Sequence, residues 1–140
     1  SLDELLDFWF ESEAKIDQQM KSYIIGLRQK GIKCYLATNN EKYRTEYLAN
    51  TVGLKNFLDG IFSSSNFGYL KSQVEFWAEV YKSFSVISTN EIMMIDNRTS
   101  AMESAKKFGF NAEHYENFEG FKKTMEEKYQ ITIYRDFNGR

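Results

Sequence analysis

The chain has 140 residues, of which 42% are hydrophobic and 27% charged, and 18 basic against 20 acidic side chains give it a net charge of -2. This balance argues against the clustered basic face of a nucleic-acid-binding protein, and no apolar run approaches the ~20 residues of a membrane span. The length is enough for one domain with its own core, and the single cysteine excludes an internal disulfide framework.

The first two elements that the sequence predicts are helices. Residues 2–10 carry apolar side chains at helical spacing, and acids stand near their start, where a helix dipole favours negative charge. Residues 15–30 show a second amphipathic pattern, which Gly31 closes. We therefore expect a short helix over 2–10 and a longer one over 15–30.

Strand-like and helical patterns then alternate along the rest of the chain. The period predicts strands at 33–38, 60–63, 91–95, 111–115 and 131–134, and helices at 41–52, 73–84, 100–108 and 118–129. Residues 64–69 are expected to form a loop. Such alternation predicts an α/β fold, a three-layer Rossmann-like arrangement in which helices cover both faces of a mostly parallel sheet of four or five strands.

Polar side chains stand at the carboxyl ends of the predicted strands. Thr38 and Asn39 end the first clear strand, residues 63–66 follow the second, and Asp96 and Asn97 end the third. In an open parallel sheet the ligand crevice lies outside these ends, so a hydroxyl, amides and a carboxylate gathered there could hold a phosphate and a divalent metal. On residue type alone, Thr38 and Asn39 fit a strand end and a helix cap equally well.

Three segments, in this order, resemble motifs of the haloacid dehalogenase-like (HAD) hydrolase superfamily, in the branch with a helical cap. The family's second motif resembles GIKCYLATNN, which puts the phosphate-binding hydroxyl at Thr38. The third resembles FSSSNFGYLKSQVEFW, which puts the motif's lysine at Lys71, and the fourth resembles EIMMIDNRTSAMESAKKFGF, with Asp96 in the metal-ligand place. The resemblance runs over residues 20–115.

The resemblance implies a phosphatase that depends on Mg²⁺ and acts on a small phosphorylated metabolite through an aspartyl-phosphate, with dehalogenation as a lesser option. Thr38, Asn39 and Lys71 would bind the phosphate, Lys71 would also screen the charge between nucleophile and phosphate, and Asp96 with Asn97 would hold the metal. It further implies that residues 1–14 are a remnant helix of the cap and residues 15–140 the HAD-like core. The acidic N-terminus lacks a signal-peptide pattern, so we expect a cytoplasmic protein with no nucleic-acid or membrane partner.

The sequence also departs from the family pattern. Ser72 stands where the family usually has proline, and Asn97 replaces the second acid of the fourth motif. No apolar strand ending in Asp-x-Asp-Gly precedes Leu2, so the core is expected to lack its first strand and the nucleophile that follows it. The exposed apolar surface left by a missing strand would favour self-association.

A near-match to the missing motif follows the last predicted strand, as Asp136-Phe137-Asn138-Gly139. A permuted arrangement would place that strand in the vacant centre of the sheet and bring Asp136 near Thr38 and Asp96, whereas a simpler interpretation is a terminal edge strand. The nucleophile is therefore upstream of the chain, Asp136, or absent. In the last case the chain is a catalytically inactive HAD-like domain that binds a partner or a phosphorylated ligand. We expect Thr38, Lys71 and Asp96 to converge at one edge of the sheet.

Overall fold

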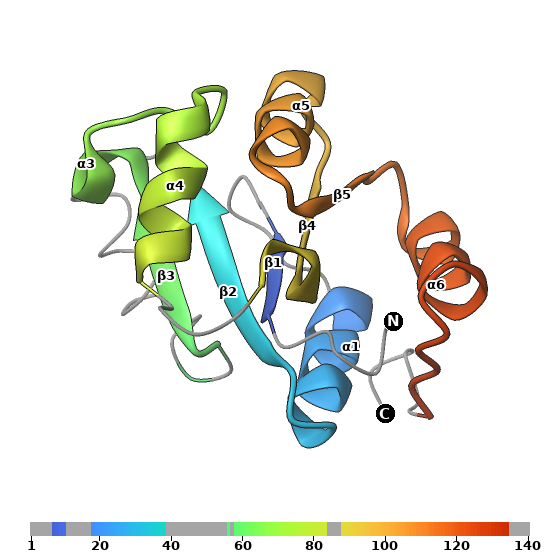
Figure 1. Cartoon of the computed structure of the whole chain (residues 1–140). Helices are drawn as coiled ribbons and strands as arrows, with labels where there is room; N and C mark the ends of the chain where they lie inside the picture. Colours follow the sequence, from blue (N-terminus) through green and yellow to red (C-terminus); the bar gives the residue numbers. More distant parts are fainter. Residues whose placement is uncertain (1–6, 11–17, 39–55, 57, 84–87, 135–140) are drawn as a thin grey trace.

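A five-stranded parallel sheet forms the centre of the computed structural model, which describes residues 7–10, 18–38, 56, 58–83 and 88–134. The strand order within these residues is β3-β2-β1-β4-β5, and every pairing is parallel. The strands are β1 (Asp7–Phe10), β2 (Lys33–Thr38), β3 (Gly60–Ser63), β4 (Ile92–Asp96) and β5 (Asn111–His114). The predicted α/β class and parallel sheet are confirmed (Figure 1).

The strand at the centre of the sheet is β1, where a helix was predicted. Phe8 pairs with Cys34 of β2 on one side and with Met93 of β4 on the other. The predicted helix over 2–10 is therefore wrong within 7–10, and so is the expectation that the core lacks its first strand. Aromatic residues favour strands, and the helical spacing rested on too few residues to outweigh pairing on both sides. The segment assigned to a cap remnant thus contributes a strand to the core.

Helices fill the connections between the strands. They are α1 (Gln18–Gln29), α3 (Ser64–Phe67), α4 (Val74–Lys82), α5 (Thr99–Phe108) and α6 (Phe118–Glu127), with a 3-10 turn η4 (Thr89–Glu91). Four match predicted helices, α3 forms where a loop was expected, and the helix predicted over 41–52 lies outside the described residues. Gly31 has a φ of 87° and turns the chain from α1 into β2, as its place in the sequence indicates. None of the described helices is long and apolar enough to cross a membrane.

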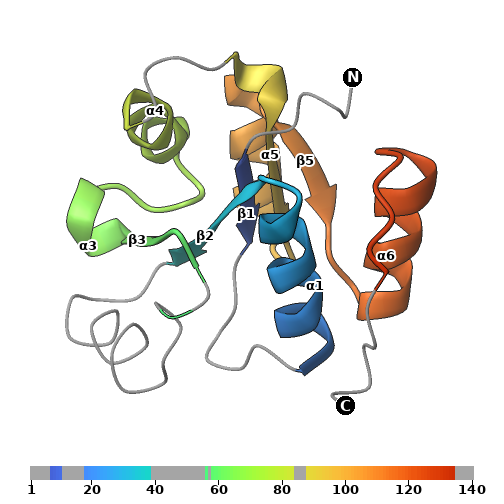
Figure 2. The same cartoon turned by 90° about the horizontal axis from the view of Figure 1, so that it is seen from below.

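Two apolar layers cover the two faces of the sheet. Along β2, Cys34 and Leu36 belong to the cluster built with α1 and α6, whereas Tyr35 and Ala37 belong to the cluster built with α4 and α5. This alternation follows from the period-2 geometry of a strand that is buried on both sides, and Figure 2 shows the helices on either side of the sheet. In the first layer, burial and the nearby Glu126 and Cys34 raise the pKa of the Tyr23 phenol.

The segment 131–134 does not join the sheet, although it was predicted to be a strand. Ile131 and Ile133 are buried in the layer of α1 and α6, so their apolar character is used for helix packing instead of strand pairing. Because β1 already holds the central place, the permuted arrangement is wrong. Asp136 itself lies outside the described residues, and the argument for self-association loses its basis, since no central place is vacant.

The position of β1 predicts strong protection of its backbone amides from hydrogen exchange. The amides of Phe8 and Phe10 lie between two neighbouring strands, so they should exchange as slowly as that of Leu36 in β2, through global unfolding. The amide of Ala112 in the edge strand β5 serves as the internal comparison and should exchange faster. Fast exchange at Phe8 and Phe10 in native-state hydrogen-exchange NMR would contradict the central strand.

Candidate functional site

The carboxyl ends of the strands form one edge of the sheet. β1 ends at Phe10, opposite Leu36 of β2 and Ile95 of β4. β2 continues to Thr38, which is opposite Ser63, and β4 continues to Asp96, which is opposite His114. Since all five strands run in the same direction, the backbones of Thr38 and Asp96 lie at this edge on opposite sides of the end of β1.

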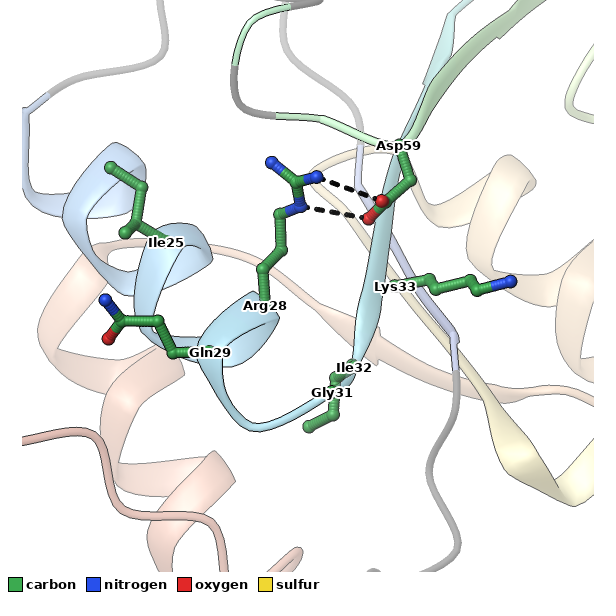
Figure 3. A pocket seen from close by; sticks show the side chains of 7 residues that line it. All are labelled: Ile25, Arg28, Gln29, Gly31, Ile32, Lys33 and Asp59. Atoms are coloured by element: carbon green, nitrogen blue, oxygen red, sulfur yellow. Dashed lines mark hydrogen bonds and ion pairs between the residues drawn. The ribbon is translucent and has the colours of Figure 1, made fainter.

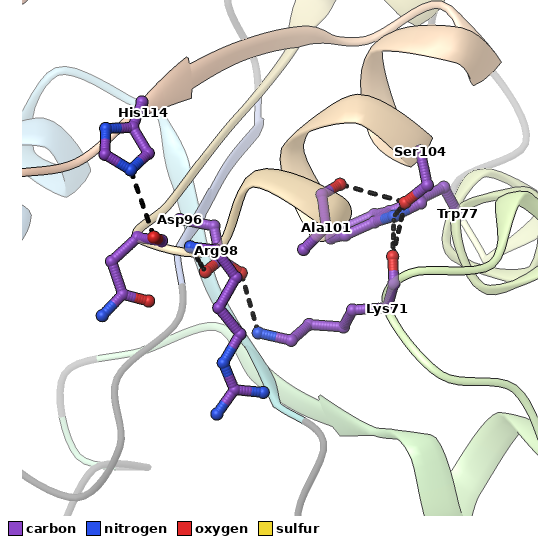
Figure 4. Close-up of polar contacts among 8 residues, drawn as sticks. Lys71, Trp77, Asp96, Arg98, Ala101, Ser104 and His114 are labelled. Carbon is purple, nitrogen blue, oxygen red and sulfur yellow. Dashed lines mark hydrogen bonds and ion pairs between the residues drawn. The ribbon is translucent and has the colours of Figure 1, made fainter.

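A buried ion pair joins Lys71 to Asp96 at this edge. Asp96 lies on the same side of β4 as Ile92 and Met94, which is the face that α4 and α5 cover. Lys71 lies in the turn that precedes α4, and its Nζ is 2.8 Å from Oδ2 of Asp96, with both side chains 0% exposed (Figure 4). A buried charge requires a partner of opposite charge, so each of these two side chains compensates the other in the interior.

The second carboxylate oxygen of Asp96 is also engaged. The backbone N–H of Arg98, the residue that caps α5, donates to Oδ1 of Asp96 over 2.8 Å. The carboxylate thus accepts from an ammonium on one oxygen and from a helix N-terminus on the other. Asp96 therefore presents a fixed, charged group at the carboxyl edge.

Two further residues hold the backbone of Lys71, and neither was predicted from the sequence. The indole Nε1 of Trp77 donates to the carbonyl oxygen of Lys71 over 2.9 Å and lies 2.8 Å from Oγ of Ser104. That hydroxyl in turn contacts the carbonyl oxygen of Lys71 and is 3.0 Å from that of Ala101. One signal could have found them, because a buried tryptophan N–H and a serine among the alanines of a helix face both need a hydrogen-bond partner.

The other predicted site residues are placed only in part. The side chain of Thr38 and the whole of Asn39 lie outside the described residues, so their predicted phosphate contacts stay predictions. Asn97 is exposed, and its carbonyl oxygen is 3.1 Å from Nε2 of His114, which is exposed at the end of β5. Of the three residues expected to converge, Lys71 and Asp96 are in contact and Thr38 shares their edge by its backbone.

The described residues fit part of a magnesium site. They contain no group of three or more histidine, cysteine or acidic side chains placed to hold a metal. Magnesium, however, is usually bound by one or two carboxylates together with water and phosphate oxygens, and Asp96 suits one such place. Further oxygens would have to come from Asn97 or from residues outside the described part of the chain.

A cavity of about 450 Å³ lies at the opposite edge of the sheet, beside Lys33 at the start of β2 (Figure 3). Arg28 of α1 reaches across it, and its Nε and Nη2 each donate to one oxygen of Asp59 over 3.1 Å. Asp59 also accepts from the backbone N–H of Cys34, over 2.8 Å. These contacts tie α1 to the chain that leads into β3, so we interpret the pair as structural. Cys34 itself is buried.

The ion pair predicts a non-additive mutational cycle. Lys71→Met or Asp96→Asn should each lower the free energy of unfolding by about 3–5 kcal/mol, because one partner stays buried without its counter-charge. The double variant should lose less than the sum of the two. Urea denaturation measures all three, with Lys82→Met as the control, because the exposed Lys82–Glu79 pair contributes little. Additive losses would contradict a direct pairing.

Comparison with solved structures shows where this fold recurs. An uncharacterised protein from Corynebacterium glutamicum matches with a TM-score of 0.72 and 12% identity, over 91% of this chain and 97% of its own. A mutant HAD family enzyme from Bacteroides thetaiotaomicron, in complex with magnesium and inorganic phosphate, matches with a TM-score of 0.64 and 17% identity, over 76% of this chain and 58% of its own. A HAD phosphatase from Thermococcus onnurineus matches with a TM-score of 0.62 and 19% identity, over 70% and 45%.

These likenesses establish the fold, and the chain spans little more than half the length of the Bacteroides enzyme and less than half of the Thermococcus phosphatase. Among curated proteins none matches the sequence significantly. The model of the haloacid dehalogenase-like hydrolase family, however, matches residues 10–114, which is well over half of the chain and includes the edge where Lys71 meets Asp96. The chain therefore belongs to the haloacid dehalogenase-like hydrolase family.

Proposed function

We propose that this chain carries the core of a phosphatase that depends on Mg²⁺ and acts on a small phosphorylated metabolite. The observation that carries the proposal is the fully buried Lys71–Asp96 pair at the carboxyl edge of a parallel sheet. An open sheet of this kind binds its ligands at that edge, and the edge here offers a fixed cation beside a fixed anion. In a member of this family, such a pair suits a reaction in which negative charge moves between a carboxylate and a phosphoryl group.

Each residue has a separate role in the proposed reaction. Lys71 neutralises charge between the attacking carboxylate and the phosphoryl oxygens, while Thr38 and Asn39 donate hydrogen bonds to one of those oxygens. Asp96, with Asn97 beside it, would hold Mg²⁺, which when bound neutralises further charge on the phosphoryl group. Asp96 thus restrains the Lys71 ammonium as well as offering a metal ligand.

We place the attacking carboxylate directly after β1. In the resembled family the nucleophile follows the first strand of the core, and we equate that strand with β1 because β1 holds the central place in the sheet. The sequence continues from Phe10 with Glu11, Ser12 and Glu13, which lie outside the described residues. We assign the attack on phosphorus to Glu11: its oxygen forms a bond to phosphorus, the bond to the leaving oxygen breaks, and a proton from Glu13 neutralises the leaving group.

A second candidate function is a non-catalytic HAD-like domain that binds a phosphorylated ligand or a protein partner. One observation favours it, because both oxygens of Asp96 already accept from N–H donors, which leaves the carboxylate partly occupied by the protein itself. Glutamate in place of the family's aspartate, and Asn97 in place of its second acid, point the same way. Turnover decides between the two functions.

The proposed phosphate contact at Thr38 predicts a matched pair of variants. Thr38→Val removes the hydroxyl at nearly constant volume and should lower kcat/KM for p-nitrophenyl phosphate by about 10²-fold, whereas Thr38→Ser should keep most of the activity.

Turnover should stop when EDTA removes the metal and return on addition of excess Mg²⁺. Equal activity of the two Thr38 variants would rule out the hydroxyl contact, and turnover in EDTA would rule out the metal requirement.

The assignment of the nucleophile predicts that Glu11 and Asp136 differ sharply. Glu11→Gln should abolish turnover, because an amide does not attack phosphorus, and Asp136→Asn should leave it unchanged. Borohydride added during turnover should reduce the phosphorylated carboxyl group of Glu11 to an alcohol. Mass spectrometry of the digested protein then locates the modified residue. Reduction at Asp136 in place of Glu11, or full activity of the Glu11→Gln variant, would refute the assignment.

A further inference from the structure

The backbone of Lys71 is held from two helices at once. Trp77, on α4, donates its indole N–H to the carbonyl oxygen of Lys71, and Ser104, on α5, contacts the same oxygen through its hydroxyl (Figure 4). The side chain of Trp77 is fully buried and Ser104 is only 6% exposed, so solvent does not compete for these bonds. The carbonyl of Lys71 is therefore fixed relative to both helices.

The helix α5 also holds Asp96, the other partner in the ion pair. The cap residue of α5, Arg98, engages Asp96 through its backbone N–H, while Ser104, in the middle of α5, engages Lys71. The turn that carries Lys71 is closed on its other side by Gln73, whose side chain accepts from the N–H of Leu70 over 2.7 Å. Lysine has a long, flexible stem, so these backbone contacts determine where its ammonium can reach.

We propose that Trp77 and Ser104 are positioning residues that set the Lys71 ammonium against Asp96. Both act through the carbonyl oxygen of Lys71, and neither contacts the reacting groups. Loss of either bond frees the turn, and the Nζ to Oδ2 distance of 2.8 Å is no longer enforced. The catalytic meaning of this placement rests on the proposed phosphatase function, but the placement itself is a property of the folded chain.

The experiment observes the Lys71 ammonium directly, without activity. A buried, ion-paired ammonium exchanges its protons slowly, so Lys71 should give a ¹H–¹⁵N cross-peak, which the Lys71→Met variant identifies by its absence. Ser104→Ala should broaden or abolish this cross-peak in a chain that still folds, as judged by its backbone amide spectrum, and Ser104→Cys, which keeps a donor, should retain it. Trp77→Phe should have the same effect as Ser104→Ala.

The matched control is Ser83→Ala, because Ser83 also bonds a helix carbonyl, that of Glu79, but is exposed and remote from Lys71 in the hydrogen-bond network. It should leave the cross-peak unchanged. An unaltered cross-peak in the Ser104→Ala variant overturns the proposal, and since Ser104→Ala removes only one oxygen atom, that test does not depend on whether Trp77→Phe folds.

A second measurement separates this proposal from the proposed function. If the chain turns over p-nitrophenyl phosphate, Ser104→Ala should lower kcat about ten- to a hundredfold with little change in KM, because a misplaced ammonium affects the reaction more than binding. If the wild-type chain shows no turnover, the phosphatase proposal fails, whereas the ammonium cross-peak still decides whether Trp77 and Ser104 position Lys71. Unchanged kcat in an active Ser104→Ala variant would overturn the catalytic role of the placement.

Discussion

The contact between Lys71 and Asp96 is the interaction on which the candidate site depends. Two opposite charges that are both fully buried require each other, since either one alone would have to be neutralised or exposed. Replacing both by apolar residues would be less costly for the fold than removing one. The pair lies at the edge where open parallel sheets bind their ligands, and the proposed function uses both of its charges in the reaction.

The helix α5 has a larger part in this site than its sequence suggests. Its cap residue, Arg98, binds the carboxylate through the backbone, and Ser104 meets the carbonyl of the lysine. The turn before α4 and the end of β4 are separated along the chain, and both are hydrogen-bonded to the same helix, which holds them close together. The opposite edge of the sheet has its own ion pair, Arg28–Asp59, which is partly exposed and ties α1 to the sheet.

Much of the fold could be predicted because the longer strands are buried on both faces. Segments such as Lys33–Thr38 and Ile92–Asp96 appear in the sequence as continuous apolar runs followed by a polar residue, and that pattern is local. The strand β1 could not be predicted in the same way, because four residues carry too little periodicity and its pairing partners are distant in sequence. The opposite error occurred at residues 131–134, where a strand was predicted and none formed. Their strand propensity is high, but none of the described strands pairs with them.

Only those residues of the candidate site that belong to the three ordered sequence motifs could be predicted. Lys71 and Asp96 could be singled out because each stands at a recognisable place relative to a strand or helix, and the ion pair shows that these two side chains meet. Their roles in binding and catalysis stay predictions. Trp77 and Ser104 were missed because their importance lies in the direction of one N–H and one hydroxyl. Such directions depend on tertiary packing, which one sequence does not encode as a pattern.

The central place of β1 has a consequence for how the chain folds. Along the chain β2 lies much nearer to β1 than β4 does, because residues 11–91 separate β4, the second neighbour of β1, from it. During synthesis one long edge of β1 therefore stays without its partner until residues 11–91 have been made, and unpaired strand edges are sites of misassociation. Pairing between segments this far apart also carries a high loop-closure entropy, so completion of the sheet centre is a late and slow event.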